Sequence, residues 1–170
     1  STSTTWTTAG SPYIVQSDVT VAAESGPAPV LTINAGVTVK FNAGTGLYIG
    51  SGSFPGKLYA VGLSTSKITF TANGSTQRGF HNSIFFDDGA DNTSILQYAN
   101  VYYGGGANPG NVTVSACNVT VKKCTIRYSS NAGIYLQNGA KPVMSGNSVA
   151  YCSSYPLSFD PSCRVASVTS

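Results

Sequence analysis

Three aspartates that stand close together in the sequence are side chains whose type and spacing could hold a cation. Asp87, Asp88 and Asp91 occur in the run Phe-Asp-Asp-Gly-Ala-Asp, and carboxylate oxygens are ligands that Ca²⁺ prefers. The same run could instead form a turn in which Asp caps its own backbone and Gly89 takes the left-handed conformation. The run has neither an Asp-x-Asp-x-Asp spacing nor a distant Glu, so the sequence favours the turn and keeps the three aspartates as a candidate metal site.

Arg78 and His81 form a candidate acid–base group on the long loop from Thr71 to Ser83, with Asp87 nearby in the sequence. A histidine on a loop is more often simply solvated, and that alternative is favoured. The other carboxylates, isolated from one another in the sequence, are Asp18, Glu24 and Asp160. Because no paired carboxylates and no activated nucleophile can be assembled, the sequence predicts no catalytic residues, no cofactor and no enzymatic activity.

Four cysteines lie in the last third of the chain, at Cys117, Cys124, Cys152 and Cys163, without a Cys-x-x-Cys spacing. Zinc sites usually have closer pairs, so the sequence favours disulfides over a metal site. Of the three possible connectivities, the favoured one pairs Cys117 with Cys124 and Cys152 with Cys163. Cys117 and Cys163 fall at equivalent corners of the repeat described below, ~9.6 Å apart, which exceeds the ~7 Å between Cα atoms that a disulfide spans.

Four sequons make candidate N-glycosylation sites at Asn73, Asn92, Asn111 and Asn118. In a chain rich in Asn, Ser and Thr, some sequons arise by chance. Together with the expected disulfides, they predict an extracellular or cell-surface protein.

A repeat, clearest in residues 119–157, must position these groups. Val121 recurs as Met144, about 23 residues later, and the same step backwards leads to Tyr98. The other equivalent positions are Ile126 with Val149 and, one step back, Tyr103. Apolar residues alternate within each repeat, which is the period of β-strands. Three short strands with their turns cannot bury an apolar side alone, so the repeat predicts a parallel β-solenoid whose coils stack.

In these residues the chain resembles the right-handed parallel β-helix proteins of the pectate-lyase-like superfamily, and more closely their secreted prokaryotic members. The phrases that carry the resemblance are Val119-Thr-Val121, Cys124-Thr-Ile126 and Asn131-Ala-Gly133-Ile134-Tyr135-Leu136, with Leu31-Thr-Ile33-Asn34-Ala-Gly36-Val37-Thr-Val39-Lys40-Phe41 near the start. The resemblance implies an all-β fold, a right-handed parallel β-helix of about six coils with about 23 residues per coil in the C-terminal half. Enzymes on this fold usually act on acidic polysaccharides, so the resemblance also implies an alternative function in binding or degrading carbohydrate.

The expected organisation is one domain. Residues 1–16 are expected to form an N-terminal arm that caps the first coil, and residues 17–170 a single β-helix domain. One outward column is expected to hold Thr38, Thr69, Tyr102, Thr125 and Ser148. Another is expected to hold Tyr48, Phe85, Thr113, Tyr135 and Ser158, where aromatic rings could stack on sugars. An unbroken threonine array would suggest an ice-binding plane, but Tyr102 interrupts the first column.

The charge composition excludes several partners. Only 9% of the residues are charged, and the net charge is +3 with no basic run longer than Lys122-Lys123. This composition predicts binding neither to nucleic acid nor to a membrane surface. Membrane insertion is not expected either, because no apolar run reaches transmembrane length.

Sparse charge and the missing catalytic group favour a non-enzymatic structural or adhesive module, with the subunit of a surface filament as one form. The sequence predicts end-to-end self-association, because the last coil has strands at Leu157–Phe159 and Val165–Val168 but no third strand. In this hypothesis Ile14 and Val15 of the N-terminal arm complete the coil that begins at Leu157 of another copy. Such a contact does not close on itself, so it would give a filament. Glycans remain possible partners under the alternative function.

Overall fold

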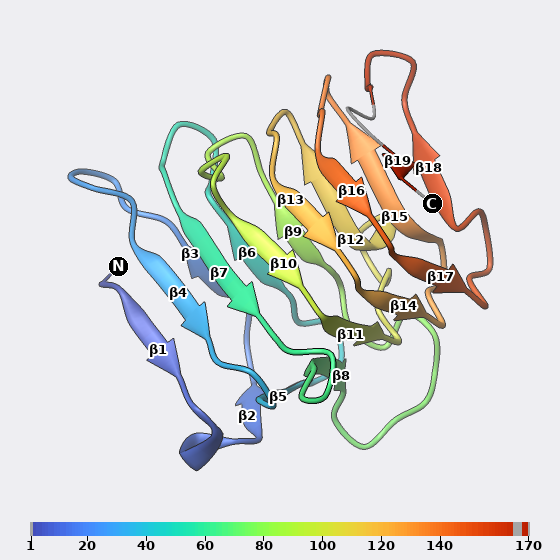
Figure 1. Ribbon diagram of the computed structural model, residues 1–170, viewed down its shortest axis with the longest axis horizontal. Coiled ribbons are helices and arrows are strands. Elements are labelled where there is room, and N and C mark those ends of the chain that lie inside the picture. Colours follow the sequence, from blue (N-terminus) through green and yellow to red (C-terminus); the bar gives the residue numbers. More distant parts are fainter. Residues whose placement is uncertain (1, 165–167, 170) are drawn as a thin grey trace.

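The computed structural model describes residues 2–164 and 168–169, which form three parallel β-sheets wound into a β-helix (Figure 1). Each coil adds one strand to sheet A, then one to sheet B and one to sheet C. This arrangement confirms the predicted all-β solenoid of about six coils.

The strands are short, and most of those in the middle of the solenoid alternate buried and more exposed residues. Sheet A holds β1 (Thr4–Trp6), β4 (Val30–Ile33), β7 (Lys57–Val61), β10 (Ile95–Gln97), β13 (Thr120–Lys122), β16 (Val143–Ser145) and β19 (Val168–Thr169). Sheet B holds β2 (Tyr13–Val15), β5 (Thr38–Phe41), β8 (Ile68–Ala72), β11 (Ala99–Tyr102), β14 (Thr125–Arg127) and β17 (Ser148–Ala150). Sheet C holds β3 (Val19–Val21), β6 (Leu47–Ile49), β9 (Ile84–Phe86), β12 (Gly110–Ser115), β15 (Ala132–Gln137) and β18 (Leu157–Phe159). A single 3-10 turn, η1 (Thr8–Gly10), joins β1 to β2.

The length of a coil varies along the solenoid. Thr120 pairs with Val143, which is the step that the sequence predicted, but the step from Ile95 to its partner Thr120 is longer. The longest step, from Tyr59 to Ile95, contains the loop between β8 and β9. The loops that connect the three sheets therefore set the coil length, because the strands themselves stay short.

This variation corrects two predicted core positions. Leu96 pairs with Val121, and Val101 pairs with Ile126, so Leu96 and Val101 fill the inner columns that a constant step assigned to Tyr98 and Tyr103. Both displaced tyrosines stand in the left-handed region, at φ 49° and 67°, which turns them outward at the corners of the coil. The inner column of sheet C, from Leu47 to Leu157, lies as predicted.

The segment in which the sequence predicted an N-terminal arm contributes two strands to the solenoid. β1 pairs in parallel with β4, and β2 pairs with β5, so the described part of this segment belongs to the first coil of the solenoid. Val15 is buried and opposite Phe41 of its own chain, whereas the side chain of Ile14 is 41% exposed beside Lys40. The segment is therefore not a free donor arm. Leu157, half-buried in β18, pairs with Ile134.

The strand predicted at 165–168 falls partly outside the described residues. What the structure describes there is β19, which pairs with β16.

Candidate functional site

Two of the three candidate calcium ligands, Asp87 and Asp91, cap backbone groups of their own turn. Asp91 Oδ1 accepts hydrogen bonds from the backbone N–H and the hydroxyl of Thr93, at 2.7 and 2.6 Å, and these bonds lower the pKa of the Asp91 carboxyl. Asp87 accepts from the N–H groups of Asp88 and Gly52. Within residues 2–164, no three His, Cys, Asp or Glu side chains gather around a common point, so these aspartates are not brought together as a metal site.

Gly89 of this turn is not in the left-handed region, contrary to the prediction. A Cβ on Gly89 would instead run into the carbonyl oxygen of Phe54, so glycine is needed there for the close approach of two loops.

The candidate acid–base group is not assembled either. His81 is fully buried, its ring stacked on Phe41 with 4.5 Å between centroids, and its Nε2 lies 2.8 Å from the carbonyl oxygen of Tyr102. A carbonyl only accepts, so Nε2 carries the proton, and burial lowers the pKa of His81 to about 4. Arg78 Nη1 donates to the hydroxyl of Ser153, so the two side chains serve different contacts. His81 acts as a neutral part of the core, not as a solvated loop histidine.

All four cysteines are free, so the predicted pairing is wrong. Cys117 precedes β13 and Cys124 follows it, and a strand at ~3.3 Å per residue holds them further apart than a disulfide can span. Cys117 and Cys163 occupy equivalent corners with Ala140 between them, as expected from the repeat. Burial raises the pKa of the Cys117 thiol to about 12 and that of Cys124 to about 11, as expected for small core residues.

One of the four sequons is inaccessible. Asn111 is fully buried, and its Nδ2 donates to the carbonyl oxygens of Val101 and Arg127, so this asparagine is not a glycosylation site in the folded chain. Asn73 is partly buried and donates to Asn42, while Asn92 and Asn118 are exposed at the corners between sheets C and A. Glycosylation of these three stays a prediction.

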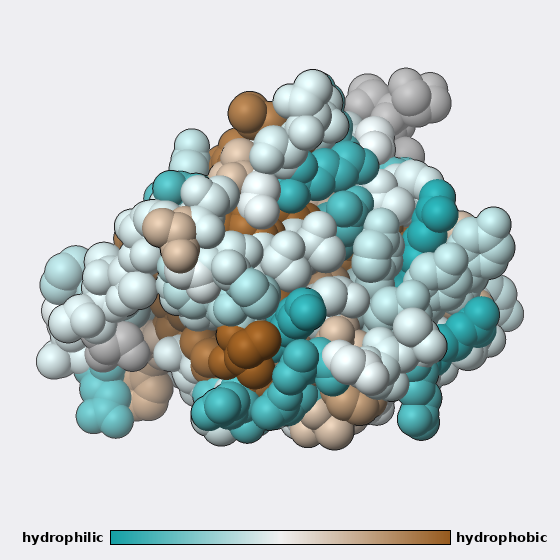
Figure 2. Space-filling model, turned by 90° about the horizontal axis from the view of Figure 1, so that it is seen from below, coloured by the Kyte–Doolittle hydropathy of each residue, from teal (hydrophilic) through white to brown (hydrophobic). Residues whose placement is uncertain are grey.

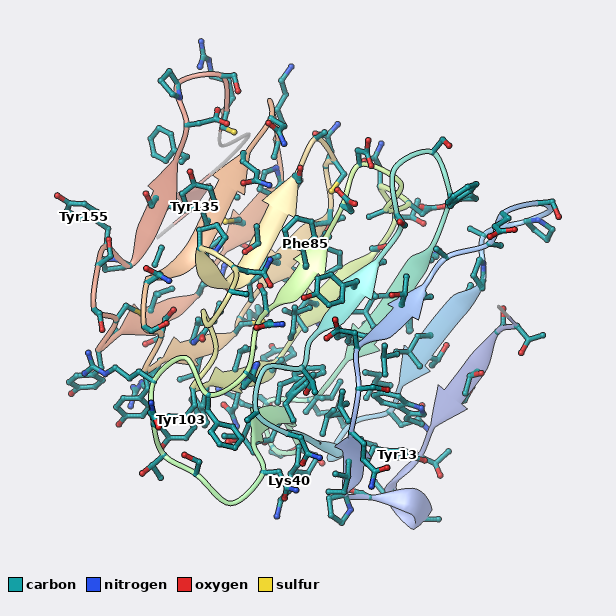
Figure 3. All side chains as sticks on the ribbon, turned by 180° about the vertical axis from the view of Figure 1, so that it is seen from behind. Tyr13, Lys40, Phe85, Tyr103, Tyr135 and Tyr155 are labelled. Atoms are coloured by element: carbon teal, nitrogen blue, oxygen red, sulfur yellow. The ribbon has the colours of Figure 1, made fainter. Side chains whose placement is uncertain are left out.

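The outer face of sheet C is interrupted by a loop. Figure 3 shows Phe85 and Tyr135 on this face, from the strands on either side of β12. Between them Thr113 is fully buried, because residues 104–109 fold over the sheet, where Asn108 accepts a hydrogen bond from the Tyr48 hydroxyl at 3.3 Å. The aromatic column that the sequence suggested as a sugar platform is therefore not a continuous surface.

The outer face of sheet B is continuous instead. Its central column holds Thr38, Thr69, Asn100, Thr125 and Ser148, one residue from each of five successive strands. Asn100 takes the place that was assigned to Tyr102, so every member carries a hydrogen-bonding group. A second column, on the side of sheet C, holds Ile14, Lys40, Thr71, Tyr102, Arg127 and Ala150. Most of this side of the molecule is coloured as neutral or hydrophilic in Figure 2.

Rows of charged and aromatic residues border this face. At the corner between sheets A and B, Lys123 Nζ donates to the Tyr98 hydroxyl at 2.9 Å. At the opposite border the rings of Tyr103, Tyr128 and Tyr151 form a stack with centroid distances of 5.2 and 5.5 Å. Each ring follows a sheet B strand at a left-handed residue, with φ between 56° and 67°.

The sequence contains a signal for the tyrosine stack, the recurrence of Tyr at the predicted step, and this signal identified two of the three rings as equivalent. Tyr128 and Tyr151 are one predicted step apart, and each directly follows an outward residue of sheet B. Tyr103 stands slightly more than one such step before Tyr128, because the loop between β11 and β12 is longer than that between β14 and β15. A fixed step therefore hid the first member.

The fold and this polar face define a β-solenoid with one outer surface on which side chains repeat in register from coil to coil. Residues 59–169 match the family model described as "Right handed beta helix region", and the chain belongs to this family. The match agrees with the predicted handedness. No curated protein and no solved structure gives a significant match. Among the described residues there is no helix of the length and apolarity that a membrane span requires.

Proposed function

We propose that this chain is a non-enzymatic extracellular structural or adhesive module whose recognition surface is the outer face of sheet B. The observation that carries the proposal is the regularity of this face, on which polar and aromatic columns run parallel to the solenoid axis. Neighbouring coils repeat at ~4.8 Å, so the face presents a periodic array of groups to a partner.

Contacts within the face hold these groups in place. Asn100 Nδ2 donates to the Thr69 hydroxyl at 3.3 Å. Lys67, which precedes β8, extends past β11 and its Nζ donates to the Thr125 hydroxyl in β14 at 2.9 Å. Ordered side chains lose less conformational entropy when a partner binds, so a preorganised face suits adhesion.

The positions of the chemically capable side chains support a non-enzymatic function. A general base must be free to take a proton from a substrate. The protonated Nε2 of His81 instead donates a hydrogen bond to a backbone carbonyl inside the core. Asp87 and Asp91 accept hydrogen bonds from their own and a neighbouring loop.

End-to-end self-association and an extracellular location remain part of this proposal. The edges of the three sheets could add strands from another copy, although β2 is already paired within its own chain and is not a donor arm.

A binding screen combined with a turnover screen tests the proposal. Pectate, alginate, neutral glycans and matrix proteins would be immobilised, and retention of the protein measured by surface plasmon resonance. We expect retention on at least one of them, lost on Asn100→Trp in sheet B and kept on the matched variant Thr120→Trp in sheet A. Release of unsaturated uronates or new reducing ends, or retention that is indifferent to Asn100→Trp, would contradict the proposal.

A further inference from the structure

Charged side chains are segregated between two ends of the coil cross-section. Figure 1 shows sheet B at the bottom and the loops that lead from sheet C to sheet A at the top. The cations at the sheet B end are Lys40, Lys67, Arg78, Lys122, Lys123 and Arg127, accompanied by the carboxylate of Asp18. The carboxylates at the opposite edge are Glu24, Asp87, Asp88, Asp91 and Asp160, accompanied by the cations Lys57, Lys141 and Arg164. The first end is therefore strongly basic and the second is acidic, within a chain of net charge +3.

Cations at the sheet B end contact neutral groups. Lys67 and Lys123 donate to the hydroxyls of Thr125 and Tyr98, and the guanidinium of Arg127 lies 5.6 Å from the centre of the Tyr151 ring. The Nε of Arg127 is shielded from solvent and has no hydrogen-bond acceptor among the described residues. These positive charges are therefore available to a negatively charged surface. Figure 3 shows Lys40 and Tyr103 at this end.

Each end also carries an exposed apolar group beside its charges. Leu63 is 56% exposed in a tight turn between β7 and β8, where it exchanges two backbone hydrogen bonds with Ser66, next to Lys67. At the acidic edge, Phe54 is 41% exposed and borders a depression of about 290 Å³. The other residues that line this depression are Thr20, Ala22, Glu24 and Ser51. A projecting apolar side chain beside a cation and a depression beside a carboxylate are complementary features.

We infer that copies of this chain associate side to side, with the sheet B end of one copy docked on the acidic edge of the next. The inference rests on the proposed structural function and names a second copy as its partner. When two copies lie side by side with their solenoid axes parallel, the opposite charges of the two surfaces lie at similar positions along the axis. Asp88 and Lys67 belong to the same coil, β7 to β9. Glu24 and Lys40 lie in adjacent coils, ~4.8 Å apart along the axis, as do Asp160 and Arg127.

This contact is heterologous, because it joins two different surfaces. A heterologous contact between parallel copies does not close on itself, so it produces an open row. Charges would set the orientation and the salt dependence of the contact, while the apolar groups supply buried area. Nucleic acid fits less well, since the stacked faces of Tyr103 and Tyr128 are not available to bases.

Sedimentation of matched charge variants tests the inference. Lys40→Gln with Lys67→Gln removes two charges from the basic end, and Lys57→Gln with Lys141→Gln removes two from the acidic edge, so both variants have the same net charge. In low salt we expect the wild type to self-associate and the first variant to do so about tenfold more weakly. The second variant should associate at least as well as the wild type. High salt should weaken the association of all three proteins.

Charge exchange gives the sharper test. The double variant Lys40→Glu, Lys67→Glu reverses two charges at the basic end and leaves the acidic edge intact. The double variant Glu24→Lys, Asp88→Lys reverses two charges at the acidic edge and leaves the basic end intact. Neither variant should associate alone, but an equimolar mixture should associate into rows in which the two variants alternate, because opposite charges then face each other at both kinds of contact. Circular dichroism melting shows whether each variant is folded, and all four side chains are on the outside of the solenoid.

Three results would overturn the inference. The wild type could stay monomeric at high concentration in low salt. The two glutamine variants could weaken association equally, or the mixture of charge-exchanged variants could fail to associate. Binding of the monomeric chain to alginate, DNA or anionic vesicles that depends on Lys40 and Lys67 would assign the basic end to another partner. Retention on an immobilised polymer, its loss on Asn100→Trp and the absence of turnover can all be measured on a chain that stays monomeric, so failure of this inference is distinguishable from failure of the proposed recognition surface.

Discussion

Replacing Tyr128 should reverse the usual order of alanine and glycine in a β-rich fold. The residue stands at φ 59°, and its ring stacks on Tyr103 at 5.2 Å and on Tyr151 at 5.5 Å. The ring also meets Tyr102 edge-on with 6.2 Å between centroids, and loss of the three aromatic contacts costs about 1.5–4.5 kcal/mol beyond the lost burial in both substitutions. Alanine keeps the strain of the left-handed conformation, about 1–2 kcal/mol, whereas glycine relieves it.

Glycine also has a disadvantage, because it gives the unfolded chain about 0.4–1 kcal/mol of additional conformational entropy. The difference leaves Tyr128→Gly more stable than Tyr128→Ala by roughly 0.5–1 kcal/mol. Chemical denaturation followed by circular dichroism measures the two free energies of unfolding.

Tyr135 provides the control, since it lies within β15 in extended conformation. There Tyr135→Ala should be more stable than Tyr135→Gly, the ordinary order for a strand. If alanine is also the more stable substitution at position 128, the stored strain is absent and the reasoning fails.

Three further predictions concern the core and the first coil. Val121→Asp places a carboxylate among fully buried apolar residues and should unfold the domain; an unchanged melting temperature would mean that the inner column of sheet A is wrong. His81 has a pKa lowered to about 4 in the folded state, so the unfolded state binds the proton first and stability should fall as the pH drops from about 6.5 through 4. His81→Gln should flatten this slope relative to the wild type in melting curves, and parallel slopes would contradict the assignment. Deleting residues 1–16 removes β1 and β2 and exposes Leu31 and Phe41, so it should lower the melting temperature instead of leaving a stable monomer.

Connection lengths decided the register of the coils. The alternation of apolar residues is a local property, and the predicted step holds in the last coils, from β13 to β16 and from β14 to β17. Residues 104–109 lengthen one coil, and the step backwards from Val121 then points to Tyr98 instead of Leu96. Tyr98 itself adopts the left-handed conformation, and this turns its side chain outward at a corner of the coil. The period of the apolar residues does not predict where such a corner falls.

The sequence by itself determined the class of fold, because stacking of identical short strands follows from composition and period alone. It also indicated that Asp87 and Asp91 belong to a turn, since Asp side chains bond to backbone within a few residues. Side chains that depend on distant partners were decided by the tertiary structure. Winding buried Asn111 between two coils, placed His81 on Phe41, and held Cys117 and Cys124 at opposite ends of a strand. The same winding gathered cations that are scattered along the chain onto one side of the solenoid, because positions far apart in sequence recur at one place in every coil.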